Sequence, residues 1–341
     1  MPVSFTPYRH LLRPLLFALD PERVHHLAMG GLQRFGPAIQ RLRKPHDPRL
    51  ARNVFHVRFP TPVGLAAGFD KNALALPAWA ALGFGFAEVG TITARAQPGN
   101  PKPRIFRVPE IGGLINRMGF NNDGADAIAD RLKRLEASGK WPRIPVGINI
   151  GKSKVTPLAE ATSDYLLSFE RLQHYGDYFV LNISSPNTPG LRQLQDRRAL
   201  DELLDTIQRR NTEQKPVLIK IAPDLEWAAI EEILVLADEH KLAGLIATNT
   251  TVDHSEVPER RRQQGGLSGS PLRARATQIV RFIAEKSPIP VIASGGIDSV
   301  DAALEKLDAG AALLQLYTGF IYEGPALVRD ICDAILRRSE R

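Results

Sequence analysis

The chain has 341 residues, of which 43% are hydrophobic and 24% are charged, and its formal net charge is +7. This composition is typical of a globular protein and excludes a disordered or fibrous chain. The single cysteine, Cys332, excludes a disulfide framework and any multi-cysteine zinc or iron–sulfur site, so we expect no metal centre. No apolar run reaches the roughly 20 residues of a membrane-spanning helix, and we expect neither such a helix nor a secretory signal.

The positive charge is concentrated at the N-terminus. The first 50 residues contain eight Lys or Arg and three Asp or Glu, a net charge of +5, which leaves only +2 for the rest of the chain. These basic residues are interleaved with Leu, Phe and Ala, as in an amphipathic surface helix and unlike a solvated basic tail. We therefore expect no nucleic-acid partner.

The N-terminal segment predicts two short helices, at about 7–18 and 21–35. The second begins with Asp-Pro-Glu at 20–22, which offers an N-cap, a proline in the first turn and an acidic residue beside it. An apolar stripe follows, made by Leu27, Leu32 and Phe35. Two interpretations fit equally well: a helical lid on the main domain, or a module that faces a membrane or a hydrophobic ligand.

From about residue 60, short apolar strands alternate with amphipathic helices. The strands are predicted at 63–67, 86–89, 146–150, 178–184, 216–221, 243–248, 290–294 and 313–317, and the helices near 73–82, 123–137, 162–175, 198–211, 226–240, 272–286, 298–308 and 325–338. Eight such units match a (β/α)₈ barrel better than a doubly wound sheet. We predict an α/β protein with a (β/α)₈ TIM barrel at 46–341 and a short helical extension at 1–45.

Glycine-rich elements follow three consecutive predicted strands, at 265–269, 295–296 and 317–319. In barrels, the loops after the last strands commonly bind phosphate, because glycine lets backbone N–H groups approach an anion. One glycine pair alone would indicate only a turn. The three together favour a phosphorylated ligand or cofactor.

Asparagines also gather at the predicted strand ends, where we find Asn116, Asn149, Asn182, Asn187 and Asn249. A buried amide costs free energy unless its donor and acceptor groups are hydrogen-bonded. Together, these side chains offer paired donors and acceptors without charge. Such a set suits a planar ring with alternating N–H and C=O groups, such as a pyrimidine dione.

Two lysines complete the candidate site. Lys220 lies inside a strand between isoleucines, so its ammonium must face an anion, such as negative charge that develops on a cofactor. Lys71 follows the first strand beside Asp70 and is either functional or half of a surface ion pair. No histidine lies at these strand ends, so metal-dependent hydrolysis and glycosidase chemistry have no support.

Six motifs in this order closely resemble the dihydroorotate dehydrogenase family: AAGFDKN, NRMGFNN, NISSPNTPGL, GGLSG, GGI and YTGF. The resemblance covers essentially the whole chain, and NISSPNTPGL is highly specific by itself. The N-terminal LFALDPERVHHL resembles the extension of the class 2 enzymes, which are quinone-dependent and membrane-associated. Class 1 enzymes use a cysteine as the base, whereas this chain has Ser185 at the matching position.

The resemblance implies oxidation of (S)-dihydroorotate to orotate in pyrimidine biosynthesis, with one FMN per chain and a membrane quinone as the electron acceptor. Ser185 would be the catalytic base while the hydride passes to FMN, with Thr188 and an ordered water relaying the proton outward. The resemblance also implies a monomer attached peripherally to the cytoplasmic face of the cell membrane through the N-terminal helices.

The residue roles are carried over by position. FMN would be bound by Ala67, Gly68, Phe69, Asp70, Lys71, Thr91, Asn149, Asn182, Lys220, Thr248, Gly269, Gly296, Tyr317 and Thr318. The substrate would be bound by Lys71, Asn116, Arg117, Met118, Gly119, Phe120, Asn182, Asn187, Asn249 and Thr250. The inner end of a quinone tunnel would be lined by His25, Arg107 and Tyr317.

Two other functions remain as alternatives. Another FMN barrel, such as a dihydropyrimidine or tRNA dihydrouridine reductase, would bind flavin without responding to orotate. A basic barrel that binds nucleic acid would be colourless and would bind DNA or RNA in a salt-dependent manner.

Overall fold

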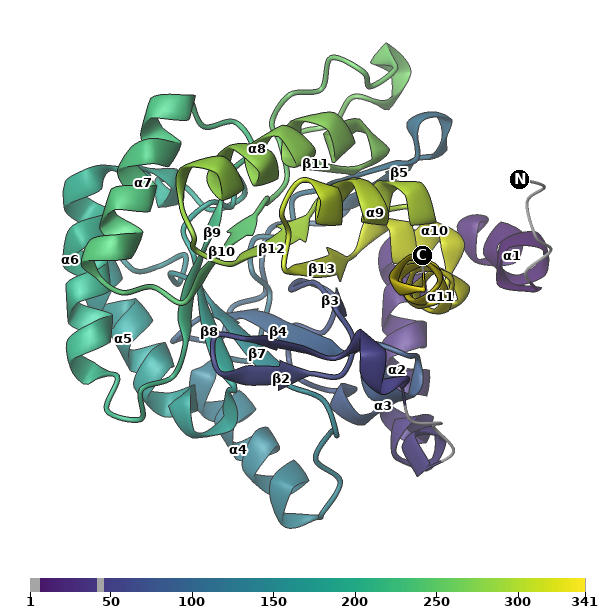
Figure 1. Cartoon of the computed structure of the whole chain (residues 1–341), viewed down its shortest axis with the longest axis horizontal. Helices are drawn as coiled ribbons and strands as arrows, with labels where there is room; N and C mark the ends of the chain where they lie inside the picture. Colours follow the sequence, from purple (N-terminus) through teal and green to yellow (C-terminus); the bar gives the residue numbers. More distant parts are fainter. Residues whose placement is uncertain (1–6, 42–45, 341) are drawn as a thin grey trace.

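Eight parallel strands form a closed barrel at the centre of the molecule, in the computed structural model that describes residues 7–41 and 46–340 (Figure 1). Around the barrel they are β3 (Val63–Leu65), β4 (Phe86–Ile92), β7 (Val146–Ile150), β8 (Tyr178–Asn182), β9 (Val217–Ile221), β10 (Gly244–Ala247), β12 (Val291–Ser294) and β13 (Leu313–Leu316). Pairing of β13 with β3 closes the barrel. The predicted fold class and its eight strands are confirmed.

The barrel strands are continuous apolar runs because both of their faces are covered. Every residue of β7 and β9 is buried, including Lys220 in the middle of β9. Three strand ends differ from the prediction by two residues or more, and β8 is one of them, since it ends at Asn182 and not at 184. The first strand stops at Leu65 and the chain turns at Gly68, where φ is 96°, whereas β4 continues past an irregularity to pair Ile92 with Ile150.

Amphipathic helices surround the barrel and bury their apolar faces against it. They are α3 (Leu76–Ala81), α4 (Ala125–Ala137), α5 (Ala161–Leu172), α6 (Arg197–Arg210), α7 (Trp227–Glu239), α8 (Arg273–Lys286), α9 (Val300–Asp308) and α11 (Ala326–Ser339), with the short α10 (Thr318–Glu323) after β13. The predicted helices are present, but α3 is shorter than the predicted 73–82. The Asp70 carboxylate accepts hydrogen bonds from the backbone N–H groups of Leu74 and Ala75, which holds these two residues in a loop.

A hairpin that the sequence pattern did not predict covers the end of the barrel where the strands begin. Its strands, β1 (Arg52–Val54) and β2 (Val57–Phe59), pair antiparallel. Phe59 packs edge-on against Phe86 at 5.1 Å between ring centroids and also contacts Tyr178. Because Phe86 and Tyr178 are the first residues of β4 and β8, these rings close the bottom of the barrel.

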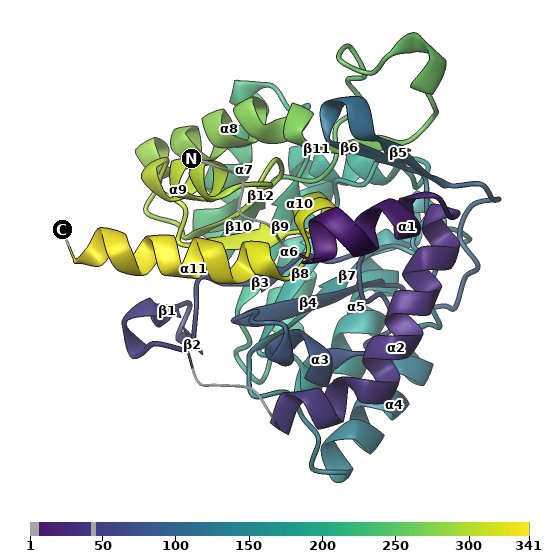
Figure 2. The same ribbon diagram turned by 90° about the vertical axis from the view of Figure 1, so that its right-hand side faces the viewer.

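A second unpredicted sheet lies over the opposite end, where the strands finish (Figure 2). It consists of β5 (Ile105–Val108), β6 (Gly113–Asn116) and β11 (Gly266–Gly269), in the antiparallel order β11-β6-β5. Val108, Ile115 and Leu267 form a small apolar core beneath it. The sheet therefore carries Asn116 and Gly269 to the mouth of the barrel.

The N-terminal arm, residues 7–41, packs along the side of the barrel (Figure 2). It contains a π-helical turn, η1 (Tyr8–Leu12), then α1 (Arg13–Phe17) and α2 (Pro21–Arg41). The second helix passes the predicted end at residue 35 because it packs closely on α3. A Cβ placed on Gly36 would lie 2.8 Å from Ala78 Cβ, so only glycine allows this approach. Among the helices of the described ranges, none is long and apolar enough to cross a membrane.

Candidate active site

A cavity that is open at its mouth lies at the carboxyl ends of the barrel strands. Binding sites of barrel enzymes lie at this face. The cavity brings together most of the predicted site residues: Ala67, Gly68, Lys71, Thr91, Asn116, Met118, Gly119, Phe120, Asn182, Ser185, Asn187, Lys220, Thr248, Asn249, Thr250, Gly269, Gly296, Tyr317 and Thr318.

Four predicted site residues lie outside this lining. Phe69 packs in an aromatic cluster, and the buried Asp70 carboxylate accepts hydrogen bonds within its own loop and from Trp79 Nε1 at 3.0 Å. Asn149 lies beneath the cavity wall. Arg117 points outward, where its guanidinium donates to Pro103 O at 3.0 Å. Asp70 and Asn149 therefore support the wall from behind, and Arg117 is directed away from it.

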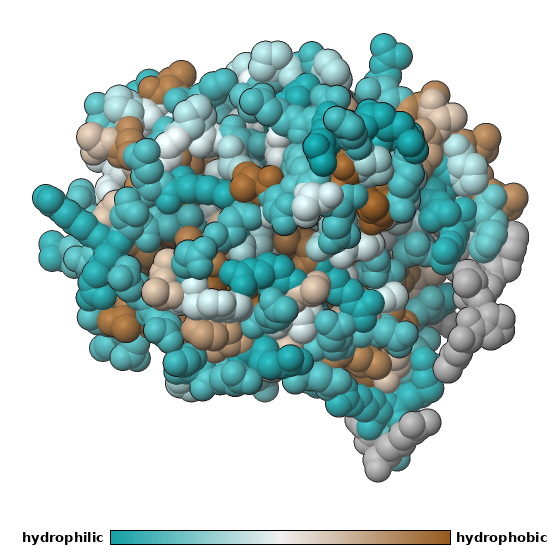
Figure 3. Space-filling view, turned by 90° about the horizontal axis from the view of Figure 1, so that it is seen from above, coloured by the Kyte–Doolittle hydropathy of each residue, from teal (hydrophilic) through white to brown (hydrophobic). Residues whose placement is uncertain are grey.

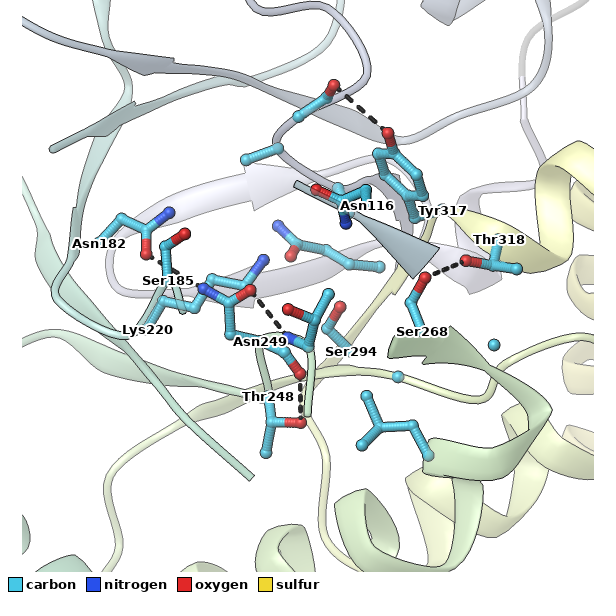
Figure 4. Close-up of a pocket in the computed structure, with 18 of the residues that line it drawn as sticks. Asn116, Asn182, Ser185, Lys220, Thr248, Asn249, Ser268, Ser294, Tyr317 and Thr318 are labelled. Atoms are coloured by element: carbon cyan, nitrogen blue, oxygen red, sulfur yellow. Dashed lines mark hydrogen bonds between the residues drawn. The ribbon is translucent and has the colours of Figure 1, made fainter. Parts of the chain in front are cut away.

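The three glycine-rich elements meet at one side of the cavity. Gly269, Gly296 and Gly319 all line it, and Ser268 Oγ lies 2.8 Å from Thr318 Oγ1 (Figure 4). A Cβ at Gly296 would lie 2.3 Å from Arg273 Cα, and one at Gly319 would lie 2.0 Å from Ile297 O. The predicted convergence of these glycines is confirmed, and it leaves backbone and hydroxyl groups to face an anion.

The opposite side of the cavity is lined by amides and by a lysine. Asn182, Ser185 and Lys220 lie together there, well separated from Thr318 and Ser268 (Figure 4). Asn116, Asn182, Asn187 and Asn249 all line the cavity. The predicted convergence of asparagines at one mouth is thus confirmed for four of the five residues, with Asn149 behind them.

Lys220 lines the cavity and is only 6% exposed, whereas Glu88 is fully buried and lies just outside the cavity. Burial lowers the pKa of Lys220, and the negative charge of Glu88 opposes this shift. Burial raises the pKa of Glu88, although Lys220 and the amides of Gln315 and Asn149 act in the opposite direction. Lys220 can therefore offer its charge to a bound group.

Lys71 lies at the mouth, where its ammonium donates to Gly68 O at 2.7 Å. Burial and repulsion by Arg104 lower the pKa of Lys71 to about 8, against the attraction of Glu22 and Asp70. The sequence left open whether Lys71 and Asp70 form a surface ion pair. They do not, because the Asp70 carboxylate is buried and hydrogen-bonded elsewhere.

Ser185 lies in the loop after β8 and lines the cavity with only 6% of its surface exposed. Its Oγ accepts a hydrogen bond from the backbone N–H of Asn187 at 3.3 Å. Arg192 braces the loop, since its guanidinium donates to Ser184 O and to Thr250 O. Thr188 is buried in the same loop.

The three residues predicted for a quinone tunnel lie where the arm meets the barrel. His25 on α2 contacts the ring of Phe69, which in turn contacts Tyr317. Burial and the nearby Lys71 lower the pKa of His25 to about 3, so its ring is neutral. Arg107 donates to Leu19 O at 2.8 Å and lies over the Phe17 ring, so it holds the turn between α1 and α2.

Several residues of the site were missed by sequence reasoning. Ser268, Ser294, Gln315 and Asp298 line the cavity, and Glu88 lies just outside it. Glu88 and Gln315 could have been found by the signal that identified Lys220, because each is a polar residue inside an apolar strand, in FAEV and in LLQLY. Thr250 Oγ1 and Gln315 Oε1 are buried and have no hydrogen-bond partner within the described residues. In those ranges no cluster of His, Cys, Asp or Glu could hold a metal ion.

Comparison with known proteins identifies the family. A family model described as dihydroorotate dehydrogenase matches residues 49–338. A curated relative from Gloeobacter violaceus, named dihydroorotate dehydrogenase (quinone), is 54% identical over 338 residues, which cover 97% of this chain and 94% of the relative. A relative from Thermosynechococcus vestitus with the same name is 50% identical and covers 99% of both chains.

Solved structures agree with this result. The crystal structure of DHODH from Eimeria tenella in complex with ferulenol superposes with a TM-score of 0.84 at 38% identity, and the match covers 94% of this chain and 93% of that one. The ligand-free protein from the same organism superposes with a TM-score of 0.82, also at 38% identity. The chain therefore belongs to the dihydroorotate dehydrogenase family.

Proposed function

We propose that this chain oxidises dihydroorotate to orotate in pyrimidine biosynthesis, with one FMN as cofactor and a membrane quinone as the electron acceptor. Relatives that carry the quinone-dependent name match the chain from end to end. One observation carries the assignment: Ser185, Lys71 and four asparagines line the same cavity as Lys220. The sole cysteine, Cys332, is buried in α11, so Ser185 is the residue available as base.

The residues that line the cavity support FMN as the cofactor by their chemistry. The cradle of Gly269, Gly296 and Thr318 would hold the phosphate, and Tyr317 would lie beside it. At the other side Ala67, Gly68, Thr91, Asn182, Lys220 and Thr248 would surround the ring system, and Asn149 would support it through Thr91. The Lys220 side chain and the unpartnered Gln315 Oε1 both belong to the cavity lining and are polar groups of the kind that a flavin ring satisfies. When bound, FMN supplies the acceptor for the hydrogen and electron pair that leave the carboxylate-bearing carbon of the substrate.

The residues of this chain then act on the substrate by binding, orientation and proton transfer. Lys71 would pair with the substrate carboxylate, and Asn116, Asn187 and Asn249 would bind the ring edge. Ser185 Oγ would take the proton from the neighbouring ring carbon as the double bond forms. Because a serine hydroxyl is a weak base, the proton must pass outward at once, and Thr188 with a water molecule would accept it.

The arm, residues 7–41, would bring the protein to the quinone. Seven large apolar side chains are exposed on it: Leu11, Leu12, Leu15, Leu19, Leu27, Phe35 and Ile39. Figure 3 shows hydrophobic side chains at the edge of the molecule where α1 lies. An apolar face with a basic excess binds a bilayer surface without spanning it. We propose that a monomer attaches in this way to the cytoplasmic face of the cell membrane, with residues 1–45 as the membrane and quinone extension and 46–341 as the catalytic domain.

The visible spectrum of the purified protein tests this function directly. We expect FMN absorbance that dihydroorotate bleaches under anaerobic conditions and that a quinone then restores. Flavin that does not respond to dihydroorotate or orotate would favour another FMN barrel. Colourless protein with salt-dependent affinity for DNA or RNA would favour a nucleic-acid-binding barrel.

A further inference from the structure

A directional chain of hydrogen bonds runs from a buried carboxylate to the cavity. Glu88 lies inside the barrel on β4, is fully buried and does not line the cavity. Its Oε1 accepts from Asn149 Nδ2 at 2.8 Å, and its Oε2 accepts from Gln315 Nε2. The carboxyl group accepts both of these hydrogen bonds, so Asn149 directs its NH₂ group toward Glu88.

This orientation is passed on from one amide to the next. Asn149 Oδ1 is left to accept from Thr91 Oγ1 at 2.6 Å and from Asn182 Nδ2 at 3.3 Å. Asn182 therefore turns its own Oδ1 toward Asn249, whose Nδ2 lies 3.1 Å away (Figure 4). Each amide donates from its NH₂ group to the oxygen before it and presents its own oxygen to the next amide, so the next amide has one favourable orientation.

The far end of this series of hydrogen bonds begins at a donor and not at an acceptor. Asn249 Oδ1 accepts from the backbone N–H of Thr250 at 2.8 Å, and a backbone N–H can only donate. Glu88 accepts a hydrogen bond at one end and the Thr250 N–H donates one at the other, and both fit the same polarity of all three amides. Asn182 and Asn249 line the cavity, so this polarity decides which of their groups face a ligand.

We propose that Glu88 is a positioning residue which, through Asn149, sets the donor and acceptor pattern that Asn182 and Asn249 present to the substrate ring. Glu88 acts without touching the ligand. The inference rests on the proposed function only for the choice of orotate as the probe.

Two substitutions distinguish whether Glu88 acts as the hydrogen-bond acceptor of Asn149 or through its negative charge. Glu88→Gln keeps an acceptor for Asn149 Nδ2, because its NH₂ group can face Gln315 once that amide turns over. Glu88→Met has a similar size but offers no acceptor, which leaves the Asn149 amide unsatisfied. We expect Glu88→Gln to bind orotate within about threefold of the unmodified protein, and Glu88→Met to bind it on the order of tenfold to a hundredfold more weakly.

Calorimetric titration of the FMN-loaded proteins with orotate measures these affinities, and the melting temperature and FMN content are recorded for each. Equal weakening in both variants would overturn the proposal in favour of a charge effect, and unchanged affinity in Glu88→Met would leave Glu88 only a role in the fold. If Glu88→Met does not fold, Asn149→Ala removes the same link, keeps the Glu88 charge and should weaken orotate binding to a similar extent. Failure of the unmodified protein to bind orotate would instead contradict the proposed function.

Discussion

Arg104 and Glu22 form a buried ion pair that fastens the N-terminal arm to the barrel. Arg104 Nη2 lies 2.7 Å from Glu22 Oε1, and both side chains are only 6% exposed. Arg104 also donates to Pro98 O and Asn100 O, so it joins α2 to the loop before β5. Burial alone would raise the pKa of Glu22, but the hydrogen bonds and charges of Arg104 and Lys102 outweigh it and hold the pKa below its usual value.

Replacing Glu22 by Gln should destabilise the protein by about 3 kcal/mol, because the Arg104 charge stays buried without its partner. Denaturant unfolding measures the loss, and limited proteolysis should show earlier cleavage within the arm. The matched control is Arg9→Gln, which breaks the more exposed pair with Glu323 and should cost at most about 1 kcal/mol. Since the Glu22 pKa is lowered on folding, its contribution is complete above the normal carboxyl range and disappears as the pH falls below it. Equal costs for the two variants would contradict the importance of the buried pair.

Replacing Ser185 by Ala should leave FMN bound and slow flavin reduction by about two to four orders of magnitude, the usual contribution of a general base. Anaerobic rapid mixing with dihydroorotate measures this rate. Thr188→Val tests the relay and should give a smaller decrease. Ser138→Ala, at the exposed end of α4, is the control and should reduce FMN at the normal rate. Reduction of Ser185→Ala within about threefold of normal would exclude Ser185 as the base.

The affinity for orotate should fall as the pH rises through the pKa of Lys71, which is about 8 in the ligand-free site. Above this pH the lysine loses the charge that pairs with the ligand carboxylate. Binding of the anion stabilises the charged lysine, so the fall should begin at or above pH 8. Lys71→Met should bind orotate weakly at all pH values, whereas Lys154→Met, which changes an exposed lysine, should keep the normal profile. A profile that is flat from pH 7 to about 10 would contradict this role.

Gly296→Ala should reduce FMN content, because the added methyl group would meet the backbone of Arg273 at 2.3 Å and displace the loop that lines the cavity. Gly139→Ala is a matched control. Gly139 has φ 66°, close to the 70° of Gly296, but a Cβ there would meet nothing within 4 Å. We expect Gly139→Ala to lose about 1 kcal/mol of stability from backbone strain and to retain its FMN. The ratio of flavin absorbance to protein absorbance in the purified proteins measures the FMN content of the two variants.

Replacing both Leu12 and Leu15 by Asp should weaken binding to anionic lipid vesicles by at least about a hundredfold, since each buried leucine contributes about 1.5–3 kcal/mol. Turnover with a long-chain quinone should fall accordingly, while reduction of the bound flavin by dihydroorotate should not change. Leu12 and Leu15 are 53% and 69% exposed, and Val235 on α7, at 48%, supplies the control Val235→Asp. Vesicle sedimentation that gives the same affinity for all three proteins would show that α1 does not bind the membrane.

The sequence by itself determined the barrel and most residues of its mouth. Continuous apolar strands such as Val217–Ile221 and amphipathic helices between them leave few other folds, and the polar residues that follow each strand must meet at one end of a parallel barrel. For this reason Lys220 and the asparagines could be predicted from the sequence pattern, whereas the resemblance to the family supplied the role of Ser185. The same local periodicity cannot indicate where a side chain turns once it leaves a strand.

Only the tertiary structure decided those directions. Asp70 and Asn149 follow strands as their neighbours do, yet their hydrogen bonds to Trp79 and Glu88 hold them behind the cavity wall. The hairpin β1–β2, the sheet β5–β6–β11 and the extension of α2 past Pro37 depend on partners far away in the chain, such as Phe86 and Ala78. The polarity of the amide chain likewise depends on Glu88 and Thr250, which lie 162 positions apart in the sequence and act on the same three side chains only because the barrel is closed.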